Sequence, residues 1–325
     1  MIVFDNFTQL KRWHNIKFVC TIGNFDGLHM AHQKLLRAVK HTAKRSHVRS
    51  LVITFRNHPQ QVGKTKKKPI LTSLQHKLVL LKHAGIDYCF VFSFHPALKN
   101  LSPEQFLHDV LFKRFPIAYI IVGYNFRFGK NRKGTPAVVD TYASHEGIRL
   151  TVQKPFTMGG MRISSSRIRK LISQGKLSKA GHLLGRRYSI FATVVRGLGR
   201  GTSLGFPTAN LDVHSEVLPP CGGYIVKVNV WDIRFERTRR GTLIHDRILN
   251  KNLTGVCNLG YAPTFGDVRS PRAEVHIPGF TCNFKGKLLE VTFYDKIRKE
   301  KKFASPLELR KQIEKDIHKA ILYFS

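Results

Sequence analysis

The strongest constraint on the fold is a change of pattern near Gly185. Before this residue, short apolar runs alternate with helical patterns, whereas after it short apolar runs follow one another with turn residues between them. The first pattern is typical of a parallel sheet covered by helices, and the second of an antiparallel sheet. We therefore predict two domains, residues 1–184 and residues 185–325, which suits a chain of 325 residues.

The first domain is predicted to be an α/β domain in which strands and helices alternate. Its strands are expected at 18–22, 51–55, 88–92, 119–122 and 150–153, and its helices at 32–44, 74–83 and 104–115. The second domain is predicted to be a small antiparallel β-barrel or sandwich that ends in a helix over 307–322. Its strands are expected at 188–195, 224–230, 255–259, 273–277 and 288–294.

Composition argues against several classes of protein. No run of 18 or more uncharged apolar residues occurs, and the N-terminal residues lack the basic and apolar regions of a signal peptide. The five cysteines are odd in number and no pair has Cys-x-x-Cys spacing, which favours reduced thiols over disulfides or zinc. We therefore expect a cytoplasmic protein without a membrane partner.

The net charge of +35 raises the question of nucleic-acid binding. The lysines and arginines are spread along the chain, and the densest runs, at 64–68, 237–240 and 299–302, are short. No nucleic-acid-binding motif accompanies the charge. We therefore expect no specific nucleic-acid partner, and instead a basic surface that suits anionic nucleotides.

A glycine-containing segment, residues 23–32, follows the first predicted strand and opens the first helix. Gly23 and Gly27 allow a sharp turn and a close approach of the backbone to a ligand. His29 and His32 are three residues apart, so they share one face at a helix N-terminus, which favours anions. The segment is typical of a nucleotide phosphate site. The alternative is a pair of histidines that only cap and pack the helix, and a metal pair lacks a third ligand nearby.

Three serines, at positions 164–166, lie where a helix is expected to begin, with Arg162 and Arg167 beside them. Hydroxyls, free amides and guanidinium groups suit the β- and γ-phosphates of ATP. An ordinary serine cap with solvated arginines is the alternative interpretation.

A second glycine-rich segment, residues 197–201, follows a predicted strand of the second domain. Its backbone amides could face a phosphate. Thr208 and Asn210 alternate on the extended segment that follows, so their side chains point the same way. A hydroxyl and an amide oxygen are hard ligands that suit Mg²⁺. A glycine-rich hairpin without a ligand explains the same residues equally well.

The motifs of the first domain resemble those of the bacterial bifunctional riboflavin kinase/FAD synthetases, within the nucleotidyltransferase superfamily. The similar segments are residues 23–32, 54–59, 122–129 and 162–167. The resemblance implies adenylyl transfer from ATP to FMN, with His29 and His32 as catalytic residues. The implied ATP ligands are Gly23, Phe25, Asp26, Gly27, His58, Asn125, Arg162, Ser165, Ser166 and Arg167.

The second domain resembles the riboflavin kinase module of the same family. The similar segments are residues 205–210, 219–224, 255–266, 273–277 and 299–316. The resemblance implies that Gly199, Gly201, Thr208 and Asn210 bind ATP, the last two through Mg²⁺. It also implies that Glu274 is the general base that takes the proton of the riboflavin hydroxyl. Without the resemblance, Glu274 reads as a surface residue of a strand.

The whole resemblance implies an enzyme that phosphorylates riboflavin to FMN and then adenylylates FMN to FAD, releasing pyrophosphate. The chain departs from the family pattern at Ala31, where glycine is usual, at Asn57, where proline is common, and at residues 234–252, a longer and more basic hairpin. Two alternatives stay open. One is a riboflavin kinase with a degenerate first domain, and the other is an RNA-binding protein that uses the nucleotidyltransferase fold.

Overall fold

The protein is described by a computed structural model, in which residues 1–12, 15–56, 69–93, 98, 100–196, 205–239, 241–260, 272–280 and 286–325 are placed. Contacts divide the chain into two compact units. Unit 1 comprises Met1–Lys68, Lys77–Ser164 and Arg234–His245, and unit 2 comprises Pro69–His76, Ser165–Ile233 and Asp246–Ser325. The two units are defined by contacts within the structure, so they do not test the predicted boundary between two functional domains at residues 184 and 185. That boundary stays a prediction.

Unit 1 is built on a parallel sheet, as predicted. Its strands are β1 (Ile2–Phe4), β2 (Phe18–Ile22), β3 (Arg49–Phe55), β4 (Tyr88–Phe92), β5 (Ile117–Gly123) and β6 (Arg149–Gln153). They pair in the order β1-β4-β3-β2-β5-β6, and each of these pairs is parallel. The chain runs from β2 through β3 to β4 on one side and returns to β5 on the other. The carboxyl ends of β2 and β5 therefore form a switch point, where ligands of such sheets bind.

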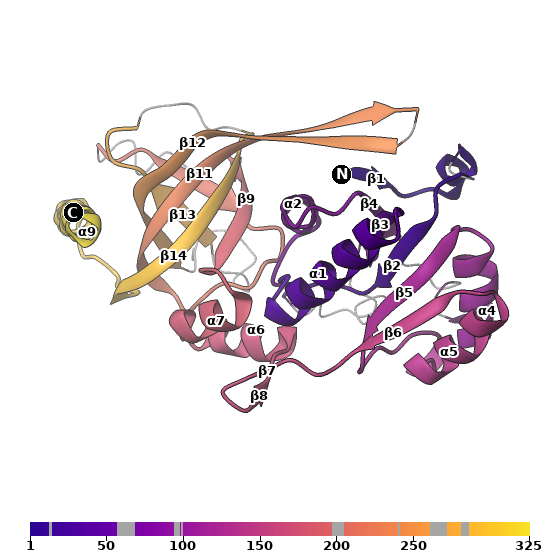
Figure 1. The fold of residues 1–325 in the computed structure, drawn as a ribbon. Helices are drawn as coiled ribbons and strands as arrows, with labels where there is room; N and C mark the ends of the chain where they lie inside the picture. The colour runs from indigo at the N-terminus through magenta and orange to yellow at the C-terminus, as the bar shows by residue number, and fades with distance from the viewer. Residues whose placement is uncertain are drawn as a thin grey trace. The chain divides into compact units, whose positions relative to one another are not determined.

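Helices cover both faces of this sheet (Figure 1). They are α1 (Met30–Arg45), α2 (Leu74–His83), α4 (Pro103–Gln105), the π-helix η3 (Phe106–Phe112) and α5 (Pro136–His145). Val39 and Ala43 of α1 pack on one face, and residues of η3 and α5 pack on the other. Every residue of β2 and of β4 is buried, because both faces are covered. Helix α5 was not predicted.

Unit 2 is strand-rich and ends in a helix. Its strands are β9 (Ser189–Val195), β10 (Thr208–Asp212), β11 (Gly222–Thr238), β12 (Gly241–Gly260), β13 (Arg272–His276) and β14 (Leu288–Lys299). They pair in the order β11-β14-β9-β10-β13-β12, and β11 also pairs with β12. Two helices, α6 (Ser165–Ser173) and α7 (Leu177–Leu184), precede the strands.

The last helix, α9 (Pro306–Phe324), begins where the sequence predicts. The Ser305 hydroxyl accepts a hydrogen bond from the backbone N–H of Glu308, and Pro306 occupies the first turn. Ala320 is fully buried in a cluster with Ile225 of β11 and Val256 of β12. This small side chain lets the helix pack closely on the strands.

Strands β11 and β12 are much longer than predicted (Figure 1). The tip of their hairpin belongs to unit 1, where Leu243 pairs with Ile2 and Thr242 pairs with Val3 in antiparallel register. The tip thus covers the edge strand β1 and satisfies backbone groups that an exposed edge would leave open. The prediction was too short because basic residues are dense in this segment and interrupt its apolar residues.

Among the described residues, no helix has the length and apolar character needed to cross a bilayer.

Candidate active sites

The loop between β2 and α1, residues 23–29, lies at the carboxyl end of the central strand. The Gly23 N–H donates to the Ile53 carbonyl at 3.0 Å, which ties the start of the loop to β3. Phe25, Gly27 and Leu28 all have positive φ, at 49°, 84° and 37°. The backbone therefore turns tightly, and at Gly27 the left-handed conformation favours glycine.

His29 and His32 lie together at the start of α1. His29 is the N-cap, and its Nδ1 accepts a hydrogen bond from the His32 N–H at 3.4 Å. The two imidazole rings stack with centroids 3.6 Å apart, and the Phe25 ring meets His32 edge-on at 5.2 Å. The two histidines therefore do cap and pack the helix, as the alternative to a phosphate site predicts. This packing fixes both rings at a helix N-terminus, so it is compatible with an anion site.

Burial lowers the pKa of His32 well below its usual value, and the positive charges of His29 and Lys77 lower it further. The Nδ1 atom of His32 is shielded from solvent, and no described residue offers it a hydrogen bond. His32 is therefore neutral near pH 7, and a neutral imidazole can donate an N–H to a phosphate oxygen without titrating.

A buried lysine that no sequence motif marks contacts the end of β3, next to this loop. Lys77 of α2 is 4% exposed, and its Nζ lies 3.4 Å from Thr54 Oγ1 and 3.2 Å from the Phe55 carbonyl. Burial lowers the pKa of Lys77 to about 8, although the carboxylate of Asp26, itself buried, acts in the opposite direction. A lysine within an otherwise apolar helix face was the only available signal.

Asn125 and Arg162 lie at the neighbouring strand end. Asn125 follows β5, which pairs with β2, and the Phe126 N–H closes a turn onto Gly123 at 2.9 Å. Arg162, in the short strand β8 (Met161–Arg162), places its guanidinium 4.8 Å from the centre of the Tyr124 ring. Both side chains are exposed, and Arg162 stacks on the residue that precedes Asn125.

The remaining predicted phosphate ligands either belong to unit 2 or lie outside the described residues. Ser165, Ser166 and Arg167 form the first turn of α6 in unit 2, where the Ser166 hydroxyl accepts a hydrogen bond from Arg169 at 3.2 Å. Helix α6 begins where the serines predict it. His58, Gly199 and Gly201 lie outside the described residues. Their predicted roles stay predictions.

The second candidate site is a polar face on three paired strands of unit 2. Glu274 of β13 is paired with Asn210 of β10 on one side and with Asn258 of β12 on the other. Residues that pair directly across an antiparallel sheet share a face. Thr208, two residues before Asn210, lies on that face as well. Asn258 was not singled out by the sequence analysis, although it lies within a segment that resembles the kinase module.

Apolar neighbours hold this face in register. Ala209, Leu211, Ala273 and Val275, which alternate with the polar residues, are buried. Burial raises the pKa of the Cys257 thiol, and the Glu274 carboxylate adds to this effect. A polar row on one face and a buried row on the other is the pattern that strand geometry requires.

A histidine anchors the entry to β10. His276 pairs with Thr208, and its Nδ1 lies 2.9 Å from the Pro207 carbonyl. The Phe206 ring meets the imidazole edge-on at 5.5 Å. These contacts fix the segment that carries Thr208, so the hydroxyl sits on a rigid strand rather than on a loop.

Comparison with known proteins decides the family. Residues 11–167 match the family model described as FAD synthetase, and residues 184–324 match the one described as riboflavin kinase. A protein named bifunctional riboflavin kinase/FMN adenylyltransferase from Bacillus subtilis is 34% identical, over 98% of this chain and 96% of that protein. The chain belongs to this family.

Further relatives agree. The proteins of the same name from Escherichia coli K12 and Haemophilus influenzae are each 33% identical, over 92% and 94% of this chain and 90% and 94% of their own lengths. A solved structure titled macrolide-efflux protein, from Streptococcus pneumoniae, has a TM-score of 0.78 at 25% identity and covers 98% of both chains. The fold is therefore shared over nearly the whole of both chains.

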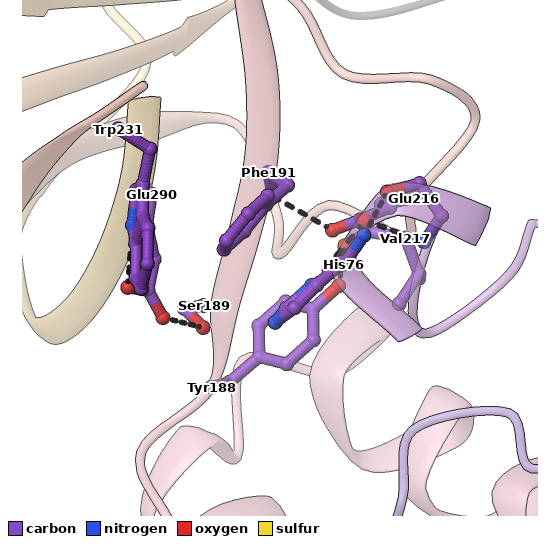
Figure 2. Close-up of polar contacts among 9 residues, drawn as sticks. His76, Tyr188, Ser189, Phe191, Glu216, Val217, Trp231 and Glu290 are labelled. Atoms are coloured by element: carbon purple, nitrogen blue, oxygen red, sulfur yellow. Dashed lines mark hydrogen bonds and ion pairs between the residues drawn. The ribbon is translucent and has the colours of Figure 1, made fainter. Parts of the chain in front are cut away.

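The kinase half of this bifunctional family member also contains a buried carboxylate that the sequence analysis did not find (Figure 2). Glu216 accepts hydrogen bonds from the N–H groups of Ser73 at 2.6 Å and of Phe191 at 3.1 Å. His76 lies 3.4 Å from the same carboxylate and stacks on the Phe191 ring at 4.3 Å. These contacts hold residues 69–76 against β9, which is a structural role.

A second carboxylate of unit 2, Glu290 of β14, has a similar role (Figure 2). It accepts hydrogen bonds from Ser189 at 3.0 Å, Asn229 at 3.0 Å and Trp231 at 3.2 Å. These three donors are neutral groups of neighbouring strands, and the Arg186 guanidinium also interacts electrostatically with Glu290. It ties β14 to β9 and β11.

Proposed function

We propose that the polar face of β10, β12 and β13 is the riboflavin kinase site and that the β2–α1 loop is the FMN adenylyltransferase site. The pairing of Glu274 with Asn210 and Asn258 carries the first assignment. The stacked histidines at the start of α1 carry the second. Each assignment agrees with the family model that matches the same part of the chain.

At the kinase site, Glu274 takes the proton of the terminal ribityl hydroxyl as that oxygen attacks the γ-phosphate of ATP, and ADP leaves. Thr208 and Asn210 offer oxygen ligands on the same face as this carboxylate, which is the donor set that Mg²⁺ prefers. We propose that these two residues hold Mg²⁺, which supplies charge neutralisation at the phosphates. Gly199 and Gly201 are proposed to face the phosphates from the preceding segment.

At the adenylyltransferase site, a phosphate oxygen of FMN attacks the α-phosphorus of ATP, and pyrophosphate leaves. His29, His32 and Arg162 stabilise the charge on the α-phosphate oxygens, together with the free amides of α1. Ser165, Ser166 and Arg167 are proposed to bind the β- and γ-phosphates. Gly23, Phe25, Asp26, Gly27, His58 and Asn125 are proposed to line the ATP site.

Three further points are part of this proposal. Since β11 pairs with both β14 and β12, we propose that the six strands of unit 2 close into a small barrel. We propose that the functional domains divide at residues 184 and 185. Because both reactions consume ATP, we propose that the enzyme works in the cytoplasm on small molecules, without a specific nucleic-acid partner.

The test is product separation. Purified protein is given riboflavin, ATP and MgCl₂, and riboflavin, FMN and FAD are resolved by chromatography over time. We expect FMN to appear first and FAD to follow, with one pyrophosphate for each FAD, and EDTA to stop FMN formation. Products that stop at FMN would favour the kinase with a degenerate first domain. Absence of FMN, together with RNA binding that persists at high salt, would favour the RNA-binding alternative.

A further inference from the structure

Lys77 is a buried charge to which the two proposed reactions assign no role. It comes from the middle of α2, and its side chain reaches the carboxyl end of β3, which is the ligand end of the parallel sheet. A buried lysine is expensive unless its ammonium is hydrogen-bonded and has an opposing charge. The groups that surround the ammonium therefore indicate the role of Lys77.

Hydrogen bonds link Lys77 to the β2–α1 loop. Its Nζ donates to Thr54 Oγ1 at 3.4 Å and to the Phe55 carbonyl at 3.2 Å. The Thr54 hydroxyl in turn donates to the carbonyl of Asn24, in the loop, at 3.3 Å. Thr54 is fully buried, so this hydroxyl has no access to water as a substitute partner. A chain of contacts thus runs from α2 through the end of β3 to the loop.

Charged and titratable groups from the neighbouring elements face this ammonium. Asp26 of the loop attracts it, and Cys89 of β4 lies within its field. On α1, the positive charges of His29 and Lys77 both lower the pKa of His32. The ammonium therefore interacts electrostatically with both the loop carboxylate and the imidazole of His32.

We propose that Lys77 is a positioning residue for adenylyl transfer: its ammonium fastens the end of β3 to the loop that carries Asp26 and supplies a fixed positive charge beside His32. This inference rests on the proposed adenylyltransferase site. It assigns Lys77 no contact with ATP or FMN. It predicts that the lysine acts on FAD formation and leaves the kinase reaction of the same chain unchanged.

Two substitutions separate the two parts of this role. Lys77→Met removes the charge and both hydrogen bonds, whereas Thr54→Val removes the bridging hydroxyl and leaves the charge in place. We expect Lys77→Met to lower kcat for FAD formation roughly tenfold to a hundredfold, the range for a hydrogen bond to a charged group, and Thr54→Val roughly threefold to tenfold. Lys82→Met, the same change five residues later in α2, is the control and should leave both kcat values unchanged.

The positive charge of Lys77 can be tested without measuring catalysis, through the pKa of His32. In the full-length protein with labelled histidine, the His32 imidazole resonance is assigned by its loss in His32→Gln and followed against pH. Lys77→Met should raise the pKa of His32, because a like charge is removed, and Thr54→Val should leave this pKa unchanged. FMN formation and the melting temperature are measured on every variant, so that a folding defect is recognised.

The outcomes decide the matter. An unchanged kcat for FAD formation in Lys77→Met overturns the proposal, and so does an equal loss of both activities. If Lys77→Met fails to fold, loss of FAD formation without loss of FMN formation in Thr54→Val still supports the positioning role, and full activity of that variant overturns it. Failure of the unsubstituted protein to form FAD would instead refute the adenylyltransferase assignment, while the His32 titration still tests the Lys77 contact.

Discussion

The two candidate sites are built in opposite ways. In unit 1, the polar groups come from a loop and a helix start at the end of a parallel sheet, and several of them are buried: His29, Asp26 and Lys77 are 5%, 3% and 4% exposed. In unit 2, the polar groups stand on one face of three antiparallel strands, and Thr208, Asn210 and Glu274 are half-buried. One site depends on tight turns and charge burial, and the other on strand register.

The difference shows what each site tolerates. Burial in unit 1 sets the protonation of His32 and Lys77 before any substrate binds, so a change in one group alters its neighbours. Register in unit 2 places Glu274 between two asparagines, and single side chains can change there without moving the backbone. We therefore expect coupled effects at the first site and local effects at the second.

The largest expected effect is local. Glu274→Gln keeps the size and strand position of the side chain but removes the base, so FMN formation from riboflavin should fall about 10²- to 10⁴-fold. FAD formation from supplied FMN should not change. Both rates are measured on one preparation, and loss of FAD formation as well would break the separation of the two sites.

His29 tests whether capping or chemistry matters at the first site. His29→Ala should remove most FAD formation and leave FMN formation intact. His29→Asn is the matched variant, because asparagine is a good N-cap but has no imidazole. We expect Asn to restore the melting temperature but not FAD formation. Full FAD formation by His29→Asn would show that the histidine is only a cap.

The hairpin tip offers a test of unit 1 that leaves the kinase face alone. Gly241 has a φ of 130°, and an added Cβ would lie 2.8 Å from Ile2 Cγ2 and 3.0 Å from the Val3 carbonyl oxygen. Gly241→Ala should therefore destabilise the protein by about 1–3 kcal/mol. Gly147→Ala, with a φ of 66° and no atom within 4 Å of the added Cβ, is the control for backbone strain alone. Equal melting temperatures of the two variants would argue against the tip as a support for β1.

The pH dependence of stability sharpens the comparison. Since the folded-state pKa of His32 lies below its usual value of 6.5, the unfolded chain binds more protons as the pH falls past this value. The contribution of His32 to stability is therefore present above pH 6.5 and is lost as the pH falls through its folded-state pKa. Urea unfolding at pH 7.5, 6.5 and 5.5 should show a steeper loss for the unsubstituted protein than for His32→Gln, by up to about 1.4 kcal/mol per pH unit. Parallel curves would contradict a folded-state pKa of His32 below its usual value.

The smallest effect is expected at Ala31, in the first turn of α1. Ala31→Gly removes a methyl group from the surface proposed to face ATP. It also costs helix stability, at most roughly 0.8–1 kcal/mol and less at a helix end. We expect a lower KM for ATP in FAD formation, a slightly lower melting temperature and an unchanged kinase reaction. An unchanged or higher KM would show that the pocket already accommodates the alanine.

The sequence predicts most of the elements that carry the sites. Continuous apolar runs identify β2 and β4, and the helix over 74–83 has the predicted bounds. The hairpin tip is not predictable, because its partner strand β1 lies more than 200 residues away. The burial of Lys77 and of Glu216 is also not predictable, because the hydrogen-bond partners of each buried charge come from other segments of the chain. His58, Gly199 and Gly201 stay predictions.

The most direct test of two independent sites is complementation in solution. Glu274→Gln and His29→Ala proteins are each incubated with riboflavin, ATP and MgCl₂, alone and as an equimolar mixture, and the flavins are separated by chromatography. We expect little product from the first protein, FMN without FAD from the second, and FAD from the mixture, because FMN made by one protein is adenylylated by the other. A mixture that accumulates FMN without FAD, while the unsubstituted protein makes both, would contradict the assignment of the two reactions to two sites.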